Sequence, residues 1–185
     1  ASKMGLSPEQ QHEIVIKWRR ASPKIYDFWY RLERAFKDAI TDGNVTTLDR
    51  NMKVFKSNGN VYIQLPNGRI VGYVTPRITD GQVSFLGLNQ TTRKWEWTKT
   101  WGGKLTENVV QAIARDCLCE TLKGCDEIGA KTIMHVHDEV ICEVPTEEKE
   151  TKFKQLLDIM AKPIDWAPGL ILVGDGFISD YYKKD

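Results

Sequence analysis

The 185-residue sequence has no long apolar run, and it contains only four cysteines and three histidines. A helix that spans a membrane needs roughly 18 or more consecutive apolar residues, and no segment approaches that length. The N-terminal stretch ASKMGLSPEQQ has neither the basic start nor the apolar run of a secretory signal. These absences point away from membrane and secreted proteins, so we expect a folded intracellular protein.

The cysteines show no C-x-x-C spacing. They are Cys117, Cys119, Cys125 and Cys142. A C-x-C pair on a helix directs its two thiols to different faces, which does not suit a shared metal. We interpret the four as reduced, mostly buried thiols, with a metal site as the alternative.

The sequence also has no internal repeat, low-complexity tract or obvious linker, but its charge is unevenly distributed. Residues 1–104 hold 17 Lys+Arg and 9 Asp+Glu, a net +8, whereas residues 105–185 hold 9 and 16, a net −7. A basic half and an acidic half would suit a protein that grips a polyanion and binds metal cations. Two differently charged solvated faces would give the same numbers.

Helix signals dominate the first 44 residues. Ser7 is a good N-cap, Pro8 suits the first helical position, and Gln10 completes a capping box. Pro23 should divide the segment into helices over residues 8–21 and 23–41. Apolar residues at steps of three and four predict one buried stripe. They are Ile14, Trp18, Ala21, Ile25, Phe28, Leu32 and Ala35.

Residues 45–101 change to short β-type runs separated by turn signals, which predicts a small antiparallel β region. Trp95, Trp97 and Trp101 recur at odd positions along its last run. We expect them to form a packed face, with a platform for base stacking as the alternative.

The C-terminal part returns to helical periodicity over residues 106–122, where Thr106 is a plausible cap. Its expected buried side contains Val110, Ile113, Ala114, Cys117, Leu118 and Thr121. A β-hairpin, a helix over about 146–161 and a strand-like GLILVGDG follow. This order predicts an α+β fold with helices on one face of an antiparallel sheet. We expect three regions, residues 1–44, 45–104 and 105–185.

Four titratable residues lie together in the predicted hairpin, namely His135, His137, Asp138 and Glu139. A carboxylate at the corner of an apolar hairpin escapes burial, stays ionised, and could bind Mg²⁺ together with substrate phosphates. An acidic turn that merely favours the hairpin is the simpler alternative. His135 and His137 could also share a strand face and bind a transition metal, but no third ligand is evident.

The helix before the hairpin carries a polar stripe. Asn108, Gln111 and Arg115 are spaced i, i+3 and i+7, so they share one side of the helix. Amide and guanidinium groups can donate to the minor-groove acceptors that every base pair presents in similar places. A solvent-exposed polar face is the alternative reading of the same spacing.

These residues carry a resemblance. The segments TWGGKLTENVVQAIARDCLCETL and IMHVHDEVICEVP resemble the C-terminal palm of family A DNA polymerases, the polymerase I type, and especially the bacteriophage branch. LPNGR is similar to the family's G-R element, and GLSPEQQHEIVIKWRRASPKIYDFW resembles the segment that follows the nucleotide-binding helix of the fingers. The likeness runs over essentially the whole chain and is most specific in the last eighty residues.

The resemblance implies roles for individual residues. Asp138 would be a metal ligand, with His137 and Glu139 beside it at the primer terminus. Gln111, and with it Asn108 and Arg115, would monitor the minor groove of the primer–template duplex. Arg69 of the G-R element would hold the nucleic acid.

Two motifs of the family are absent. The sequence contains neither D-Y-S-x-I-E, which supplies the other metal-binding aspartate, nor the R-x-x-x-K…Y-G helix that binds the triphosphate. SDYYKK at the chain end lacks the I-E that should follow, so we do not count Asp180 as the missing ligand. Two Mg²⁺ ions would need an aspartate from elsewhere.

The resemblance therefore predicts part of a DNA-directed DNA polymerase acting on primer–template DNA and deoxynucleoside triphosphates in the cytoplasm of an infected bacterium. We expect the isolated chain to be inactive and to need a larger polymerase chain that carries the absent motifs. The alternative is a non-catalytic palm fragment that binds duplex DNA or a partner protein. A free-standing hydrolase that uses His137, Asp138 and a metal is a third possibility.

Overall fold

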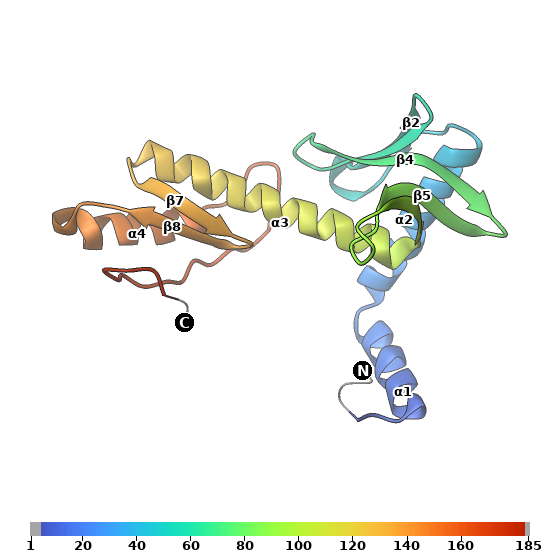
Figure 1. Cartoon of the computed structure of the whole chain (residues 1–185), viewed down its shortest axis with the longest axis horizontal. Helices are drawn as coiled ribbons and strands as arrows, with labels where there is room; N and C mark the ends of the chain where they lie inside the picture. Colours follow the sequence, from blue (N-terminus) through green and yellow to red (C-terminus); the bar gives the residue numbers. More distant parts are fainter. Residues whose placement is uncertain (1–4, 184–185) are drawn as a thin grey trace. The chain divides into compact units, whose positions relative to one another are not determined.

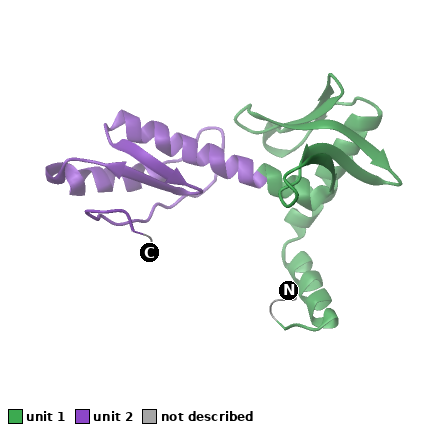
Figure 2. Ribbon diagram, in the orientation of Figure 1, with its two compact units in different colours: residues 1–109 green, residues 110–185 purple. Residues whose placement is uncertain are grey.

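A computed structural model describes residues 5–183 and divides the chain into two units, residues 1–109 and 110–185 (Figure 2). The first unit contains both the N-terminal helices and the β-rich region. The second contains the hairpin with the histidines and Asp138.

The two N-terminal helices have the predicted bounds, α1 (Pro8–Ala21) and α2 (Pro23–Thr41). The capping box forms as expected, because the Gln10 N–H donates to Ser7 Oγ at 3.3 Å and the Ser7 N–H donates to Gln10 Oε1 at 2.9 Å. Proline lacks the N–H that a continuous helix would need, and Pro23 accordingly begins the second helix.

The predicted buried stripe on these helices is correct for only two of its seven residues. Leu32 and Ala35 are buried, but Ile14, Trp18 and Ile25 are 52%, 44% and 47% exposed. The buried residues of α2 all lie in its second half, which packs against the sheet, while α1 buries no residue. The apolar stripe thus also runs along α1 and the first half of α2, but only the second half of α2 packs against the sheet of unit 1.

Six antiparallel strands follow in sequence order, so each strand pairs with the next (Figure 1). They are β1 (Thr46–Thr47), β2 (Lys53–Ser57), β3 (Asn60–Gln64), β4 (Ile70–Thr79), β5 (Gln82–Leu88) and β6 (Trp95–Thr100). The 3₁₀ turn η2 (Asp49–Asn51) lies between the first two. The register shifts between Val74 and Arg77 on β4, which marks an irregularity in that strand. This sheet is the predicted antiparallel β region.

The inner face of the sheet and α2 form the core of unit 1. Val54, Val61 and Ile63 are fully buried on this face. The ring of Tyr73 lies edge-on to Phe36 of α2 and to Phe85 of β5, with both pairs of centroids 5.0 Å apart. A helix that covers one face of an antiparallel sheet confirms the α+β prediction.

The prediction that the three tryptophans form a packed face is wrong. Trp95, Trp97 and Trp101 are 62%, 41% and 50% exposed. Trp95 pairs with Leu88 and Trp97 with Leu86, on the side of the sheet opposite Phe85 and Val83. Alternation correctly places Trp95 and Trp97 on one face, but the buried face of the sheet is the other one.

Helix α3 (Gly102–Glu127) is longer than predicted and starts earlier. Thr106 is a buried residue inside the helix and does not cap it. The start is instead tied to α2, because the Gly102 N–H donates to Glu33 Oε2 at 2.9 Å. A Cβ at position 102 would lie 2.1 Å from the Trp29 carbonyl oxygen, so only glycine allows this close approach.

The predicted buried side of α3 is also partly wrong. Leu118 and Thr121 are buried as expected, but Val110 is 58% exposed and Ala114 is exposed. Val110 opens unit 2, whereas the buried residues at the start of α3, Leu105 and Val109, belong to unit 1. Helical periodicity alone does not reveal that one helix contributes to two packing units.

Unit 2 pairs β7 (Lys131–Val136) with β8 (Glu139–Glu143) and continues with the 3₁₀ turn η3 (Thr146–Glu148) and α4 (Lys149–Met160). Helices α3 and α4 approach closely, since a Cβ on Gly124 would lie 2.5 Å from the Ile159 side chain.

The predicted C-terminal strand does not form. Residues 169–176 pair with no strand in the described part of the chain, and Ile171 and Val173 are 86% and 83% exposed. Gly174 and Gly176 of this segment lie against α4, where an added Cβ would meet Met160 and Phe153. None of the helices within residues 5–183 has the length and apolar character needed to cross a membrane.

Candidate functional site

The candidate site centres on the two-residue turn His137–Asp138, which joins β7 to β8. Val136 and Glu139 are directly paired on either side of it. The turn is tight because His137 has a φ of 51°, in the left-handed region. The left-handed backbone conformation costs a non-glycine residue about 1–2 kcal/mol of free energy relative to the ordinary negative-φ conformations. His137 therefore destabilises the turn locally. Both turn side chains are exposed and Glu139 is half-buried.

The turn separates His135 from His137. His135 belongs to β7, whereas His137 lies beyond the last strand residue, so strand alternation does not place their side chains on one face. Among the described residues, no three His, Cys, Asp or Glu side chains come together as a possible metal site. Asp138 could thus contribute one oxygen ligand to a metal whose remaining ligands come from elsewhere.

Arg115 of α3 lies against His135 of β7. Its Nη1 is 3.1 Å from His135 Nδ1, and its Nη2 is 3.4 Å from His135 Nε2. Each guanidinium nitrogen therefore faces one nitrogen of the imidazole ring. The contact joins the predicted polar stripe to the hairpin that carries Asp138. The sequence did not assign this role to His135, because helix and strand periodicities give no information about contacts between elements.

The other two residues of the stripe differ in their surroundings. Gln111 is exposed on α3 in unit 2. Asn108, in unit 1, is half-buried, and its Nδ2 donates to the Tyr73 hydroxyl at 3.0 Å. Burial raises the pKa of Tyr73, and the hydrogen bond from Asn108 opposes that shift. The amide nitrogen of Asn108 thus already has a partner within the sheet core.

Arg69 lies in the LPNGR turn between β3 and β4, in unit 1. The turn is formed by Gly68, with a φ of 88°, and by Asn67, whose Oδ1 accepts the Arg69 N–H at 3.1 Å. Arg69 is exposed. Local turn chemistry thus presents this side chain at the edge of the sheet region.

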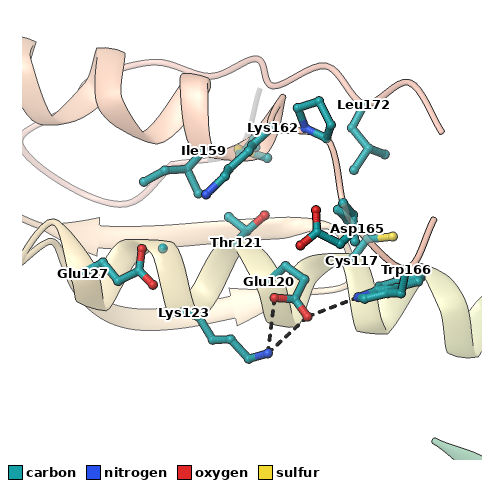
Figure 3. A pocket seen from close by; sticks show the side chains of 14 residues that line it. Cys117, Glu120, Thr121, Lys123, Glu127, Ile159, Lys162, Asp165, Trp166 and Leu172 are labelled. Carbon is teal, nitrogen blue, oxygen red and sulfur yellow. Dashed lines mark hydrogen bonds and ion pairs between the residues drawn. The ribbon is translucent and has the colours of Figure 1, made fainter. Parts of the chain in front are cut away.

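A pocket of about 210 Å³ in unit 2 lies between α3 and the segment that follows α4 (Figure 3). Glu120 accepts hydrogen bonds from Lys123 Nζ and from Trp166 Nε1, and these bonds lower the pKa of its carboxyl group. None of the predicted site residues lines this pocket. Because the Glu120 carboxylate is already paired and no predicted site residue is present, we interpret the pocket as a gap in the packing between α3 and the segment after α4.

All four cysteines are free thiols in the structure. Cys125 is buried and the other three are half-buried, in keeping with structural thiols. Burial, with a further contribution from Cys142, raises the pKa of Cys125 to about 11. Such a thiol stays protonated near neutral pH and is a poor metal ligand.

Comparison with known proteins gives one informative similarity. The chain is 41% identical, over 190 aligned residues, to a DNA polymerase of Bacillus phage SP02. The chain is homologous to part of a phage DNA polymerase. The match covers the whole of this chain but 29% of the length of that polymerase. No protein-family model and no solved structure matches the chain.

Proposed function

We propose that these 185 residues form part of the active site of a family A DNA polymerase and contribute one metal-binding aspartate, Asp138. The second aspartate and the triphosphate-binding helix would come from polypeptide outside these residues. The homology to a phage DNA polymerase supports the reaction class, although the chain spans less than a third of that relative.

The observation that carries the proposal is the geometry of the His137–Asp138 turn. An exposed carboxylate stands at the tip of a tight hairpin, next to a histidine held at a φ of 51°. Glycine, asparagine or aspartate would fit that position at lower cost. His137 is one of seven non-glycine residues with a positive φ in the described part of the chain, so this conformation supports the proposal only together with the exposed carboxylate of Asp138 beside it. We assign His137 and Glu139 to the neighbourhood of the primer terminus.

The donor set fits magnesium. Mg²⁺ prefers oxygen ligands and is commonly held by one or two carboxylates together with water and substrate phosphates. A pair of bound Mg²⁺ ions would lower the pKa of the primer 3′-hydroxyl and stabilise the in-line displacement at the α-phosphate. The Asp138 carboxylate would supply one of the protein ligands of these ions. Because this side chain is exposed, there is room beside it for the primer end.

The helix next to the hairpin would contact the duplex. Gln111 is exposed and can donate to minor-groove acceptors, which are similar for all base pairs. Arg115 would reach the duplex while its contact with His135 keeps α3 in register with the hairpin. We assign Asn108 chiefly to positioning, because its amide nitrogen is bonded to Tyr73. Arg69 would contact a phosphate of the nucleic acid.

Primer extension on two preparations tests this proposal. The first is the chain together with whatever polypeptide accompanies it when it is purified from its source, and the second is the separately expressed 185-residue chain. We expect a native mass larger than the chain and Mg²⁺-dependent extension from the first, and no extension from the second.

Two results would contradict the proposal. If the isolated monomer extends a primer with Mg²⁺ and deoxynucleotides, a second metal ligand must lie within these residues. If the larger assembly binds primer–template DNA but never extends it, a non-catalytic DNA-binding role replaces the proposed one.

A further inference from the structure

The outer face of strands β4–β6 presents aromatic and cationic side chains to solvent. Trp95, Trp97 and Lys99 alternate along β6, opposite Leu88, Leu86 and Ser84 of β5. Arg77 of β4 pairs with Ser84 and so joins the same face. We call these four residues, Arg77, Trp95, Trp97 and Lys99, the aromatic–basic face. At 62%, the exposure of Trp95 is high for so large an apolar side chain.

The surroundings of this face are basic. Residues 70–100, which form β4–β6 and the turns between them, contain four Lys+Arg and two Asp+Glu. One of the two acids, Glu96, points to the opposite side of β6 and accepts a hydrogen bond from Asn89. Within residues 5–183, no carboxylate forms an ion pair with Arg77, Lys94 or Lys99. The positive charge of this face is therefore available to an external anion.

Arg77 and Trp97 form a stacked pair. The guanidinium carbon lies 3.6 Å from the centre of the Trp97 ring. Stacking fixes the plane of the guanidinium while leaving its N–H groups at the rim, where they can bind a phosphate in a bidentate manner. Trp95, two residues earlier on the strand, has no ring or cation partner among the described residues.

We propose that the aromatic–basic face binds single-stranded DNA, with an unpaired base stacked on Trp95 and phosphates held by Arg77 and Lys99. This combination of aromatic stacking positions and unpaired cations is the one that sequence-independent single-strand binding uses. The choice of DNA as the nucleic acid rests on the proposed function. In a polymerase, the face would hold a stretch of unpaired strand away from the site of synthesis.

The spacing favours a single strand over a duplex. Residues two apart on a strand are roughly 7 Å apart, about twice the 3.4 Å rise per nucleotide of a stacked strand. A base on Trp95 and a neighbouring nucleotide at the Arg77–Trp97 pair would therefore need a strand whose bases have been pulled apart. Inside a duplex, neighbouring bases cover each other's faces, so only a terminal base pair could stack on Trp95.

The face could instead bind another polypeptide. Substitutions at Trp95 distinguish binding of single-stranded DNA from binding of a polypeptide. The measurement is anisotropy of a fluorescein-labelled oligo-dT of about 15 nucleotides titrated with the full 185-residue chain, without Mg²⁺ or nucleotides. We expect Trp95→Ala to weaken binding about 5- to 150-fold. Trp95→Phe should retain most of the affinity because it keeps an aromatic ring, whereas Trp95→Leu should behave like alanine.

A plot of log affinity against log salt concentration should be less steep for Lys99→Ala. The magnitude of its slope should fall by about 0.7, which is the contribution of one phosphate contact on a single strand. Ile171→Ala is the matched control, because Ile171 is an exposed apolar side chain in the other unit. The affinity of the Ile171→Ala chain for oligo-dT should equal that of the wild-type chain. All substituted side chains are exposed, so circular dichroism and urea titration should show unchanged folding.

Three outcomes would overturn the inference. They are equal binding by Trp95→Leu and Trp95→Phe, no measurable binding of oligo-dT by the folded wild-type chain, and preference for a blunt duplex of the same length. Because this assay needs neither Asp138 nor catalysis, these results do not bear on primer extension. A failure of primer extension likewise leaves the binding result standing.

Discussion

Asp138 follows a residue whose backbone conformation is unfavourable. At a φ of 51°, His137 lies in the left-handed region, which is uncommon for non-glycine residues although histidine adopts it more often than most, and hairpins usually place glycine, asparagine or aspartate there. The sequence locates this turn, because two apolar runs flank it, but it does not reveal the strain. Nor does the sequence reveal that Arg115 meets His135, since the two residues are twenty positions apart on different elements.

Gln111 provides a prediction about how the duplex is recognised. Because minor-groove acceptors are similar for all base pairs, Gln111→Ala should weaken primer–template binding by the assembled protein by a similar factor, about 3- to 10-fold, on every sequence. The measurement is a titration with primer–templates that differ only in the terminal base pair. Gln155→Ala, an exposed glutamine on α4, serves as the control and should have no effect. A strong dependence on the identity of the terminal pair would exclude the proposed contact.

The elements with local signals were predicted best. Helices α1 and α2 have their predicted bounds because Ser7, Gln10 and Pro23 determine them through local hydrogen bonding and sterics. The strands of the sheet follow from turn signals and alternation. The start of α3 was missed because Gly102 is held by Glu33 of α2, a contact that no local pattern encodes. The strand expected at residues 169–176 did not form, and these residues pair with neither β7 nor β8, the two strands of the same unit.

Glu33 links α2 to the start of α3 and should make the stability of unit 1 pH-dependent. Partial burial raises the pKa of Glu33, but hydrogen bonds from Lys37 and from the Gly102 N–H outweigh it, so the pKa is lowered overall. A lowered carboxyl pKa stabilises the folded state fully above the unfolded-state pKa of about 4.3, and this contribution is lost as the pH falls through the folded-state value.

Glu33→Gln should therefore reduce the free energy of unfolding by about 1 kcal/mol at pH 7, because a neutral acceptor replaces a charged one. The difference from the wild-type chain should shrink at pH 3, which urea titrations at the two pH values would measure. Glu13→Gln removes an exposed ion pair with Lys17 and should cost less at both. An equal loss for Glu33→Gln at pH 3 and pH 7 would show that the charge of Glu33 is not responsible.

For the chain as a whole, the sequence predicted the burial of side chains least well. The stripe on α1 and the tryptophans of β6 were expected to be buried, yet Ile14 and Trp95 are more than half exposed. Periodicity identifies which residues share a face, but burial depends on what covers that face, and the covering partner can be another polypeptide or a ligand. The α+β class was predicted correctly because it depends on the order of elements and not on their partners.

The charge distribution is consistent with the division into units. The basic excess lies in residues 1–104, which include the sheet and Arg69, and the acidic excess lies in residues 105–185, which include Asp138. This arrangement suits phosphate contacts by basic residues of unit 1, such as Arg69, and a metal-binding carboxylate in unit 2, which also carries the proposed duplex contacts of Gln111 and Arg115. We propose that both units act within one polymerase, as the similarity across the full chain supports.

The most direct test of the account is primer extension by the assembled protein carrying Asp138→Asn. The substitution keeps the size of the side chain and removes its charge, so we expect Mg²⁺-dependent synthesis to fall by more than about 100-fold, as when a charge stabilising the transition state is lost. Circular dichroism and assembly should be unchanged because the side chain is exposed. Asp158→Asn, an exposed aspartate on α4, should extend primers at the wild-type rate. Undiminished synthesis by a folded Asp138→Asn protein would show that Asp138 binds no catalytic metal and would contradict the account.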